Sequence, residues 1–222
     1  MLRQHAGPEL VNDAVAEAKS ALRSRLVTAR ADLDPEARAA DGGAIARWLD
    51  ASPVPLRSGD TVGAYVSIGT EPDTSALLTA LADRGLRVLV PVTADGPATA
   101  LTWARYTSSD DLAPGRFGLR EPTGERLPTD AVDAATLIFV PALAVDRAGT
   151  RLGRGAGYYD RSLTATTADL VAVVYDGELL GEVPGDGHDV AMGWALTPHA
   201  GFTRLTRPGT VGTQTRRVPD QR

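Results

Sequence analysis

A strand, a helix and a second strand follow one another between residues 61 and 90, and this order constrains the fold more than any other feature. Residues 61–66 and 87–90 are short apolar runs rich in β-branched side chains, which is typical of buried parallel strands. Residues 74–84 between them have the apolar spacing of a helix, which Gly85 ends. Because parallel neighbours need such a crossover, we expect an α/β fold: a three-layer α/β/α sandwich with a mostly parallel, Rossmann-like sheet.

Three more apolar runs are strand candidates that would extend this sheet, at residues 101–106, 136–140 and 170–175. In an open parallel sheet, ligands bind in the loops that follow the carboxyl ends of the strands. We therefore expect a binding site where such loops meet. The loops that qualify are residues 67–73, 91–97 and 141–157.

The first helix is expected over residues 8–30, whose apolar side chains recur at helical spacing. It carries Lys19, the single lysine among 23 basic residues. Codon usage explains an excess of arginine, but it does not explain why one lysine remains. Lys19 and Arg23 lie four residues apart and project from the same helix face. A lysine is a compact charge that arginine cannot always replace at a phosphate.

Residues 34–49 predict a second helix, which opens on an Asp-Pro pair. No long linker and no internal repeat divides the rest of the chain, so we expect one α/β domain over residues 8–206. Residues 1–7 are expected to be a flexible N-terminus. Residues 207–222 lack apolar periodicity and predict a disordered C-terminal tail.

Composition excludes several classes of protein. The chain has no cysteine, which rules out disulfides, iron–sulfur clusters and thiol nucleophiles. Its net charge of −5 argues against a nucleic-acid partner, because phosphate backbones demand a basic face. No apolar run is long enough to cross a membrane, and the first residues lack the apolar core of a signal peptide. We expect a cytoplasmic protein with no membrane partner, as a monomer or weak homodimer.

The segment RLGRGAGYYDR, residues 151–161, is the strongest candidate for chemistry. Its alternating glycines let backbone N–H groups approach an anion, and the run then enters a predicted helix. Arg151 and Arg154 can each donate two parallel hydrogen bonds to phosphate oxygens, and Asp160 can hold a magnesium ion bridging them. The pattern fits neither GxGxxG nor the Walker loop, since the only lysine follows Ala18. The alternative is a glycine-rich surface turn whose two tyrosines simply pack.

With the upstream VPALAVDRAGTR, this segment resembles the central motif of the 5-formyltetrahydrofolate cyclo-ligase family, also called methenyltetrahydrofolate synthetases. The resemblance extends to Lys19-x-x-x-Arg23, to SIGTEPDT at 67–74, to GLREP at 118–122 and to GHDV at 187–190. It implies an α/β sandwich and an ATP- and Mg²⁺-dependent ligase of folate and one-carbon metabolism. The implied reaction closes 5-formyltetrahydrofolate into 5,10-methenyltetrahydrofolate and releases ADP and phosphate. The implied route phosphorylates the formyl oxygen, after which the nitrogen at position 10 attacks.

The resemblance also implies roles for particular residues, with Arg154 and Lys19 as the catalytic candidates. The implied ATP-binding residues are Lys19, Arg23, Arg151, Leu152, Gly153, Arg154, Gly155, Ala156, Gly157, Tyr158 and Tyr159. The implied substrate-binding residues are Val66, Glu71, Arg154, Gly155, Ala156, Gly157 and Tyr158. The implied metal ligands are Asp160 and Asp189. Glu71 suits its role because a carboxylate can accept two parallel hydrogen bonds from the amino-amide edge of a pterin.

Two departures from the family pattern keep alternatives open. Ala156 stands where many members carry lysine or glycine, and Gly193-Trp194 occupies a stretch where another acidic residue is common. These favour, as an alternative, a relative that binds folate or nucleotide without cyclising it. A sugar-phosphate isomerase-like enzyme would share the fold but needs no ATP. Trp103 and Phe117 are further candidates for stacking on a ligand ring.

Overall fold

The fold is described from a computed structural model, which describes residues 8–93, 98–115, 120–185 and 189–206. The expectations for residues 1–7 and 207–222 lie outside the described residues. Within them, none of the helices combines the length and apolar character that a membrane span requires.

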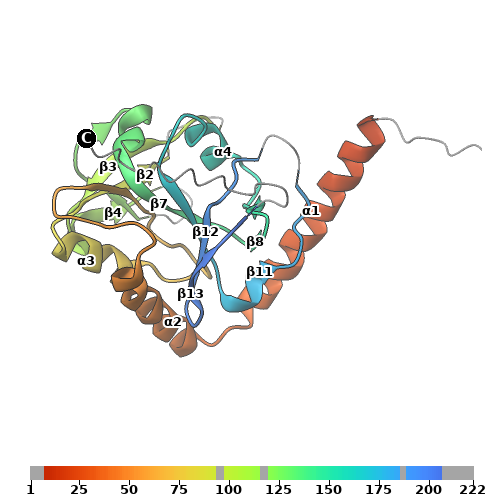
Figure 1. Ribbon diagram of the computed structural model, residues 1–222, viewed down its shortest axis with the longest axis horizontal. Helices are drawn as coiled ribbons and strands as arrows, with labels where there is room; N and C mark the ends of the chain where they lie inside the picture. The colour runs from red at the N-terminus through yellow and green to blue at the C-terminus, as the bar shows by residue number, and fades with distance from the viewer. Residues whose placement is uncertain (1–7, 94–97, 116–119, 186–188, 207–222) are drawn as a thin grey trace, which may run out of the picture.

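A mixed sheet of eight strands forms the centre of the protein, in the order β13-β12-β10-β7-β1-β2-β3-β6 (Figure 1). The five strands from β12 to β2 are mutually parallel, and antiparallel strands flank them on both sides. The predicted α/β class with a mostly parallel sheet is confirmed. The strands of this sheet are β1 (Thr61–Gly63), β2 (Arg87–Val92), β3 (Thr102–Tyr106), β6 (Arg126–Leu127), β7 (Ala135–Pro141), β10 (Asp169–Val173), β12 (Trp194–Thr197) and β13 (Gly201–Arg204).

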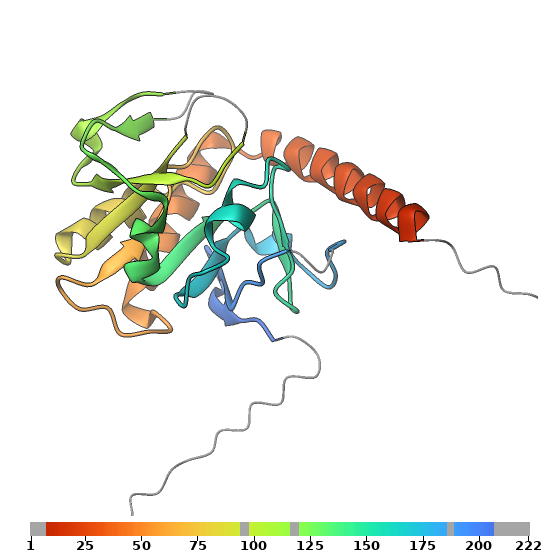
Figure 2. The ribbon, with the colours of Figure 1, turned by 90° about the horizontal axis from the view of Figure 1, so that it is seen from above.

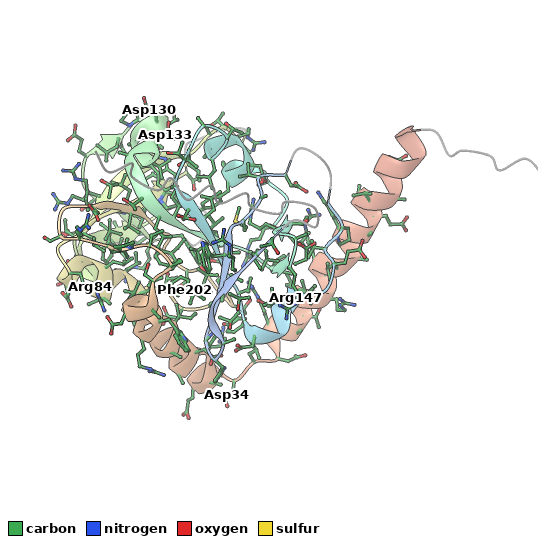
Figure 3. The ribbon with its side chains drawn as sticks, viewed as in Figure 1. Asp34, Arg84, Asp130, Asp133, Arg147 and Phe202 are labelled. Atoms are coloured by element: carbon green, nitrogen blue, oxygen red, sulfur yellow. The ribbon has the colours of Figure 1, made fainter. Side chains whose placement is uncertain are left out.

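Two helices cover one face of this sheet, α2 (Pro35–Arg47) and α3 (Ser75–Asp83). Strand residues alternate between the two faces, so Leu137 and Phe139 of β7 pack under these helices in one buried cluster. Figure 3 places Asp34 at the turn before α2, and its carboxylate accepts a hydrogen bond from the backbone N–H of Glu36 at 2.7 Å. This confirms the predicted helix start.

The opposite face has a thinner cover. Ile138 and Val140 of β7 pack there against Val132 and Leu163, which belong to short segments. Val132 lies in the 3-10 helix η4 (Thr129–Ala134), and Leu163 directly follows the short helix α4 (Tyr158–Ser162). The third layer of the sandwich is therefore made of one-turn helices and loops. Among the described residues, further 3-10 helices are η1 (Trp48–Ala51), η2 (Ser109–Asp111) and η5 (Asp176–Glu178), and β4 (Leu112–Pro114) pairs with β5 (Arg120–Pro122) in antiparallel orientation.

The first helix, α1 (Pro8–Ala31), lies beside the sheet and its N-terminal end projects beyond the body (Figures 1 and 2). Its Leu22 and Leu26 pack on a small sheet through Leu143 and Leu152. That sheet consists of β8 (Ala144–Asp146), β9 (Arg151–Leu152) and β11 (Leu179–Leu180). The helix thus faces the loop that follows β9, which contains the glycine motif.

Candidate functional site

A cavity of about 650 Å³ opens at the carboxyl edge of β1, β2 and β7. All three loops predicted from the sequence contribute to it, through Ile68 and Glu71, through Pro91 and Thr93, and through residues 141–143 and 151–160. The chain leaves β1 for β2 on one side and later returns to β7 on the other, so β1 marks the switch point where such sheets bind ligands. The loops that the sequence indicated therefore meet at one cavity, and its role in binding a ligand stays a prediction.

The charges around the cavity are unequal. Its described lining contains six cationic side chains and four carboxylates, although the whole chain has a net charge of −5. The excess of cations is therefore local to this site, and it suits a ligand that carries phosphates. The cations are Lys19, Arg23, Arg30, Arg120, Arg151 and Arg154, and the carboxylates are Glu71, Glu121, Asp160 and Asp189.

The glycine loop is held in place by Asp146, which is buried at the end of β8. Its Oδ1 accepts hydrogen bonds from the backbone of Ala148 and Thr150 at 2.9 and 2.8 Å, and its Oδ2 accepts one from Val183 at 3.0 Å. These bonds fix the turn that returns the chain into β9. The loop that follows is therefore anchored on its N-terminal side.

Two glycines of the loop adopt backbone angles that other residues rarely take. Gly155 has φ +103° and Gly157 has φ +69°, so a side chain at either position would strain the loop. Gly157 leads into α4, which is only five residues long. A predicted helix follows the glycines, but its single turn supplies little dipole to a bound anion. The charge at this loop comes from arginine side chains instead.

Lys19 and Arg23 both reach the cavity from α1, as their spacing predicts. Lys19 Nζ donates a hydrogen bond to Asp189 Oδ2 at 2.9 Å, and both side chains are mostly buried. Arg23 Nε donates to the carbonyl oxygen of Gly153 at 2.9 Å. Hydrogen bonds therefore connect α1 both to the glycine loop, through Arg23, and to the segment that precedes β12, through Lys19.

Arg151 is buried and links the loop to the sheet. It donates through Nη2 to Asp160 Oδ1 at 2.8 Å and through Nη1 to the carbonyl oxygen of Pro141 at 3.2 Å. Its guanidinium also lies over the ring of Tyr159, 5.8 Å from the centroid. Burial, with a smaller effect from Glu71, raises the pKa of Tyr159, which keeps its phenol neutral.

Arg154 and Glu71 meet across the cavity. Arg154 Nε donates to Glu71 Oε1 at 3.1 Å, while Glu71 Oε2 accepts from the backbone N–H of Ile68 at 3.0 Å. The Arg154 side chain is half-exposed and that of Glu71 is buried. Glu71 is thus held by its own loop, and the half-exposed Arg154 side chain lines the cavity.

The remaining residues expected at the site also line this cavity: Val66, Leu152, Gly153, Gly155, Ala156, Gly157, Tyr158 and Tyr159. Leu152 additionally packs beneath α1, so its side chain serves the core. Asp160 and Asp189 both line the cavity, but each is paired with a cation, and no group of three acidic or histidine side chains in the described residues forms a metal site. Trp103 is fully buried in the core, away from the cavity, so it is not a stacking candidate; Phe117 lies outside the described residues.

Sequence reasoning missed several residues that line the cavity, above all Arg30 and Tyr65. Arg30 Nε and Nη2 donate to the two carboxylate oxygens of Glu178 at 2.6 and 2.7 Å, in a buried ion pair. Arg30 falls at the end of α1 in a chain rich in arginine, and Tyr65 falls in an apolar run. Neither position carries a sequence signal that separates it from an ordinary surface or core residue.

Fold and cavity together define an α/β protein with a cation-rich cavity at the switch point of its sheet. A family model described as the 5-formyltetrahydrofolate cyclo-ligase family matches residues 15–198. The 5-formyltetrahydrofolate cyclo-ligase of Mycolicibacterium smegmatis is 46% identical over 192 residues, which cover 84% of this chain and 97% of that protein. The NMR structure of Aquifex aeolicus 5,10-methenyltetrahydrofolate synthetase superposes with a TM-score of 0.71 at 27% identity, covering 90% of this chain and 99% of that one.

A 5,10-methenyltetrahydrofolate synthetase from Mycoplasma pneumoniae shares the fold, with a TM-score of 0.60 at 19% identity, over 78% of this chain and 94% of that one. The chain belongs to the 5-formyltetrahydrofolate cyclo-ligase family, a family of enzymes that act on small molecules. The resemblance carried by its sequence motifs is confirmed, and the isomerase alternative has no support.

Proposed function

We propose that this enzyme uses ATP to close 5-formyltetrahydrofolate into 5,10-methenyltetrahydrofolate, releasing ADP and phosphate. One observation carries the proposal: a single cavity gathers Lys19, Arg23, Arg151 and Arg154 around Glu71. The reaction needs a polyphosphate and a pterin in contact, and the cavity offers cations for the first and a fixed carboxylate for the second.

The ATP phosphates are placed between α1 and the glycine loop. Lys19 and Arg23 face this loop from the helix, and Arg23 already contacts the carbonyl oxygen of Gly153. Arg151 is held by Asp160 and Pro141, so its position is set before ATP binds. The ATP contacts proposed along the loop run from Arg151 to Tyr159. Phosphoryl transfer depends mainly on alignment and on cations that balance the phosphate charge, which is what this region supplies.

The folate is placed at the other side of the same loop. Glu71 lies opposite Arg154 and is buried, so it can accept hydrogen bonds from a pterin in a site shielded from water. Val66 supplies an apolar wall just after β1. The loop residues from Arg154 to Tyr158 lie between the two proposed ligand positions, and we assign them contacts with both.

The family resemblance also implies magnesium, and the side chains at the cavity fit it in one way. Magnesium in nucleotide sites takes one or two carboxylates together with phosphate oxygens and water. Asp160 and Asp189 are the two carboxylates that would hold the ion beside the phosphates, where it would neutralise phosphate charge. Each carboxylate now pairs with a cation, Arg151 and Lys19, which holds it at the cavity wall.

The proposed chemistry has two steps. The formyl oxygen attacks the γ-phosphorus of ATP while the bond from that phosphorus to the β-bridging oxygen breaks and ADP leaves. The nitrogen at position 10 then attacks the activated carbon and loses its proton, and phosphate departs with the former formyl oxygen. Arg154 and Lys19 are the proposed catalytic residues because their charges can follow the phosphoryl group as it moves.

An absorbance assay tests this function. Protein, Mg·ATP and 5-formyltetrahydrofolate are mixed, and the near-ultraviolet absorbance of the methenyl product is followed, with reactions lacking ATP as controls. Growth that requires ATP is the expected result. A folded protein that binds the folate without absorbance growth contradicts the proposal and supports the binding-only alternative. The expectations of a cytoplasmic location and of a monomer or weak homodimer stay predictions.

A further inference from the structure

Buried polar atoms without a hydrogen-bond partner gather at the cavity. Within the described residues, five side-chain nitrogen or oxygen atoms are buried and unpaired, and three of them belong to cavity-lining residues. These three are Arg30 Nη1, Tyr65 Oη and Arg151 Nε. Native proteins leave few such atoms, because an unmet donor costs much of its hydration free energy. Because the three residues line one cavity, a ligand bound there is the candidate partner for these atoms.

Arg30 has no freedom to satisfy Nη1 by turning. Its Nε and Nη2 are engaged by both oxygens of Glu178, and Nη2 also donates to the carbonyl oxygen of Ala142 at 2.6 Å. The guanidinium lies over the ring of Tyr175, 5.4 Å from its centroid. The Arg30 side chain is therefore held in place while its Nη1 has no hydrogen-bond partner.

Tyr65 follows β1 and directly precedes Val66. It is 2% exposed. Burial raises the pKa of Tyr65, and the nearby Glu71 carboxylate raises it further, while Arg30 acts in the opposite direction. These effects make Glu71 and Arg30 its electrostatic neighbours. The phenol is neutral at ordinary pH, so its oxygen carries a proton to donate.

Glu71 presents the opposite chemistry beside these donors. A carboxylate has about four acceptor positions, and the contacts with Arg154 and Ile68 account for two of them. Buried donors and a buried acceptor thus line the same cavity. The edge of a 2-amino-4-oxopteridine carries the complement: an amino group and a ring N–H that donate, next to a carbonyl oxygen that accepts.

We propose that Tyr65 Oη and Arg30 Nη1 are specificity-determining donors that receive the 4-carbonyl oxygen of the pterin, while Glu71 receives its amino and ring N–H groups. This rests on the proposed function, which places a folate here. The site then selects a 4-oxo pteridine over a 4-amino one, because an amino group would set donor against donor at Arg30 Nη1 and leave the hydroxyl proton of Tyr65 without an acceptor.

Folic acid and aminopterin test this selection, since they differ only by oxo and amino at position 4. Their dissociation constants are measured by titration calorimetry at neutral pH, where both pteridine rings are mainly uncharged. The wild-type protein is expected to prefer folic acid. Tyr65→Phe removes only the hydroxyl and is expected to lower that preference about three- to tenfold, the share of one neutral hydrogen bond. Its melting temperature is expected not to fall.

Ser52→Ala is the matched control, because Ser52 Oγ is also buried and unpaired but lies outside the cavity. It is expected to leave the preference unchanged. An equal preference for folic acid in Tyr65→Phe and wild type overturns the inference. Turnover of 5-formyltetrahydrofolate by the wild-type protein would in that case still support the proposed function. If Tyr65→Phe loses the preference for folic acid but the wild-type protein does not turn over 5-formyltetrahydrofolate, the role of Tyr65 in binding is supported and the proposed function is contradicted. A wild-type protein that binds neither pteridine overturns both.

Discussion

Lys19 Nζ lies 2.9 Å from Asp189 Oδ2, joining the first helix to a segment 170 residues later in the chain. Both side chains line the cavity. The pair unites the single lysine, proposed to bind ATP phosphates, with a carboxylate proposed to hold magnesium. In this arrangement the carboxylate positions the lysine at the cavity wall, and arriving phosphates would bring new partners for each.

Replacing Lys19 tests the ATP side of the site. Lys19→Ala is expected to raise the apparent KM for ATP about ten- to a hundredfold, the value of one charged hydrogen bond, and to raise that for the folate much less. Lys19→Arg is expected to impair ATP use as well, because a planar guanidinium cannot occupy the place of a compact ammonium. Steady-state kinetics with each substrate varied measures both. Arg25→Ala, an exposed cation on the same helix, is the control. Equal KM shifts for the two substrates would count against the assignment.

The two candidate metal carboxylates can be tested by titration with magnesium. Asp160→Asn and Asp189→Asn are each expected to raise the magnesium concentration that gives half-maximal activity, since a neutral amide is a weaker ligand for a hard cation. Asp133→Asn, an exposed carboxylate on η4 that Figure 3 shows at the outer surface, is the matched control. A magnesium titration curve identical to wild type in either variant would remove that residue from the metal site.

The buried pair of Arg30 and Glu178 is expected to contribute strongly to stability. Glu178→Ala leaves the Arg30 charge buried with only a backbone carbonyl as partner, which costs about 3–5 kcal/mol in buried pairs of this kind. Urea unfolding of this variant and of Glu182→Ala, an exposed acidic residue nearby, measures the difference. A loss in Glu178→Ala no larger than in Glu182→Ala would show that the pair is dispensable.

The pairing of the exposed His199 with Asp176 is expected to make the stability of the protein depend on pH. Its Nδ1 lies 2.8 Å from Asp176 Oδ2, and this hydrogen bond, with the charge of Asp176, raises the pKa of His199. A raised pKa in the folded state means that the stabilisation is complete below about pH 6.5, the unfolded value, and is lost as pH rises through the folded value. The melting temperature of wild type is therefore expected to fall across this interval relative to that of His199→Gln. If the melting temperatures of wild type and His199→Gln change by the same amount over this pH interval, His199 does not contribute to the pH dependence.

Much of the fold was predictable because its signals are local. The apolar runs and the helix between them indicated a parallel sheet, and the sheet indicated where its loops would bind a ligand. The strand β1 ends earlier than its apolar run suggests, at Gly63, and Tyr65 and Val66 of that run line the cavity instead. The strands β12 and β13 escaped prediction since each has only four residues.

The site was predictable where a motif carried it and not where packing did. The glycine loop, Lys19, Arg23 and Glu71 lie together as expected. The pairing of Lys19 with Asp189 and of Arg30 with Glu178 joins residues far apart in the chain, and no local pattern encodes such contacts. Tyr65 has the sequence context of a core residue, and only its unpaired hydroxyl sets it apart.

Oxygen labelling of the substrate follows the formyl oxygen through the proposed reaction. With ¹⁸O in the formyl group, protein and Mg·ATP, phosphorylation of the formyl oxygen predicts that the label leaves in inorganic phosphate, one atom for each methenyl product formed. Mass spectrometry of the released phosphate measures this. Label that appears in water, or product that forms without labelled phosphate, would rule out phosphorylation of the formyl oxygen.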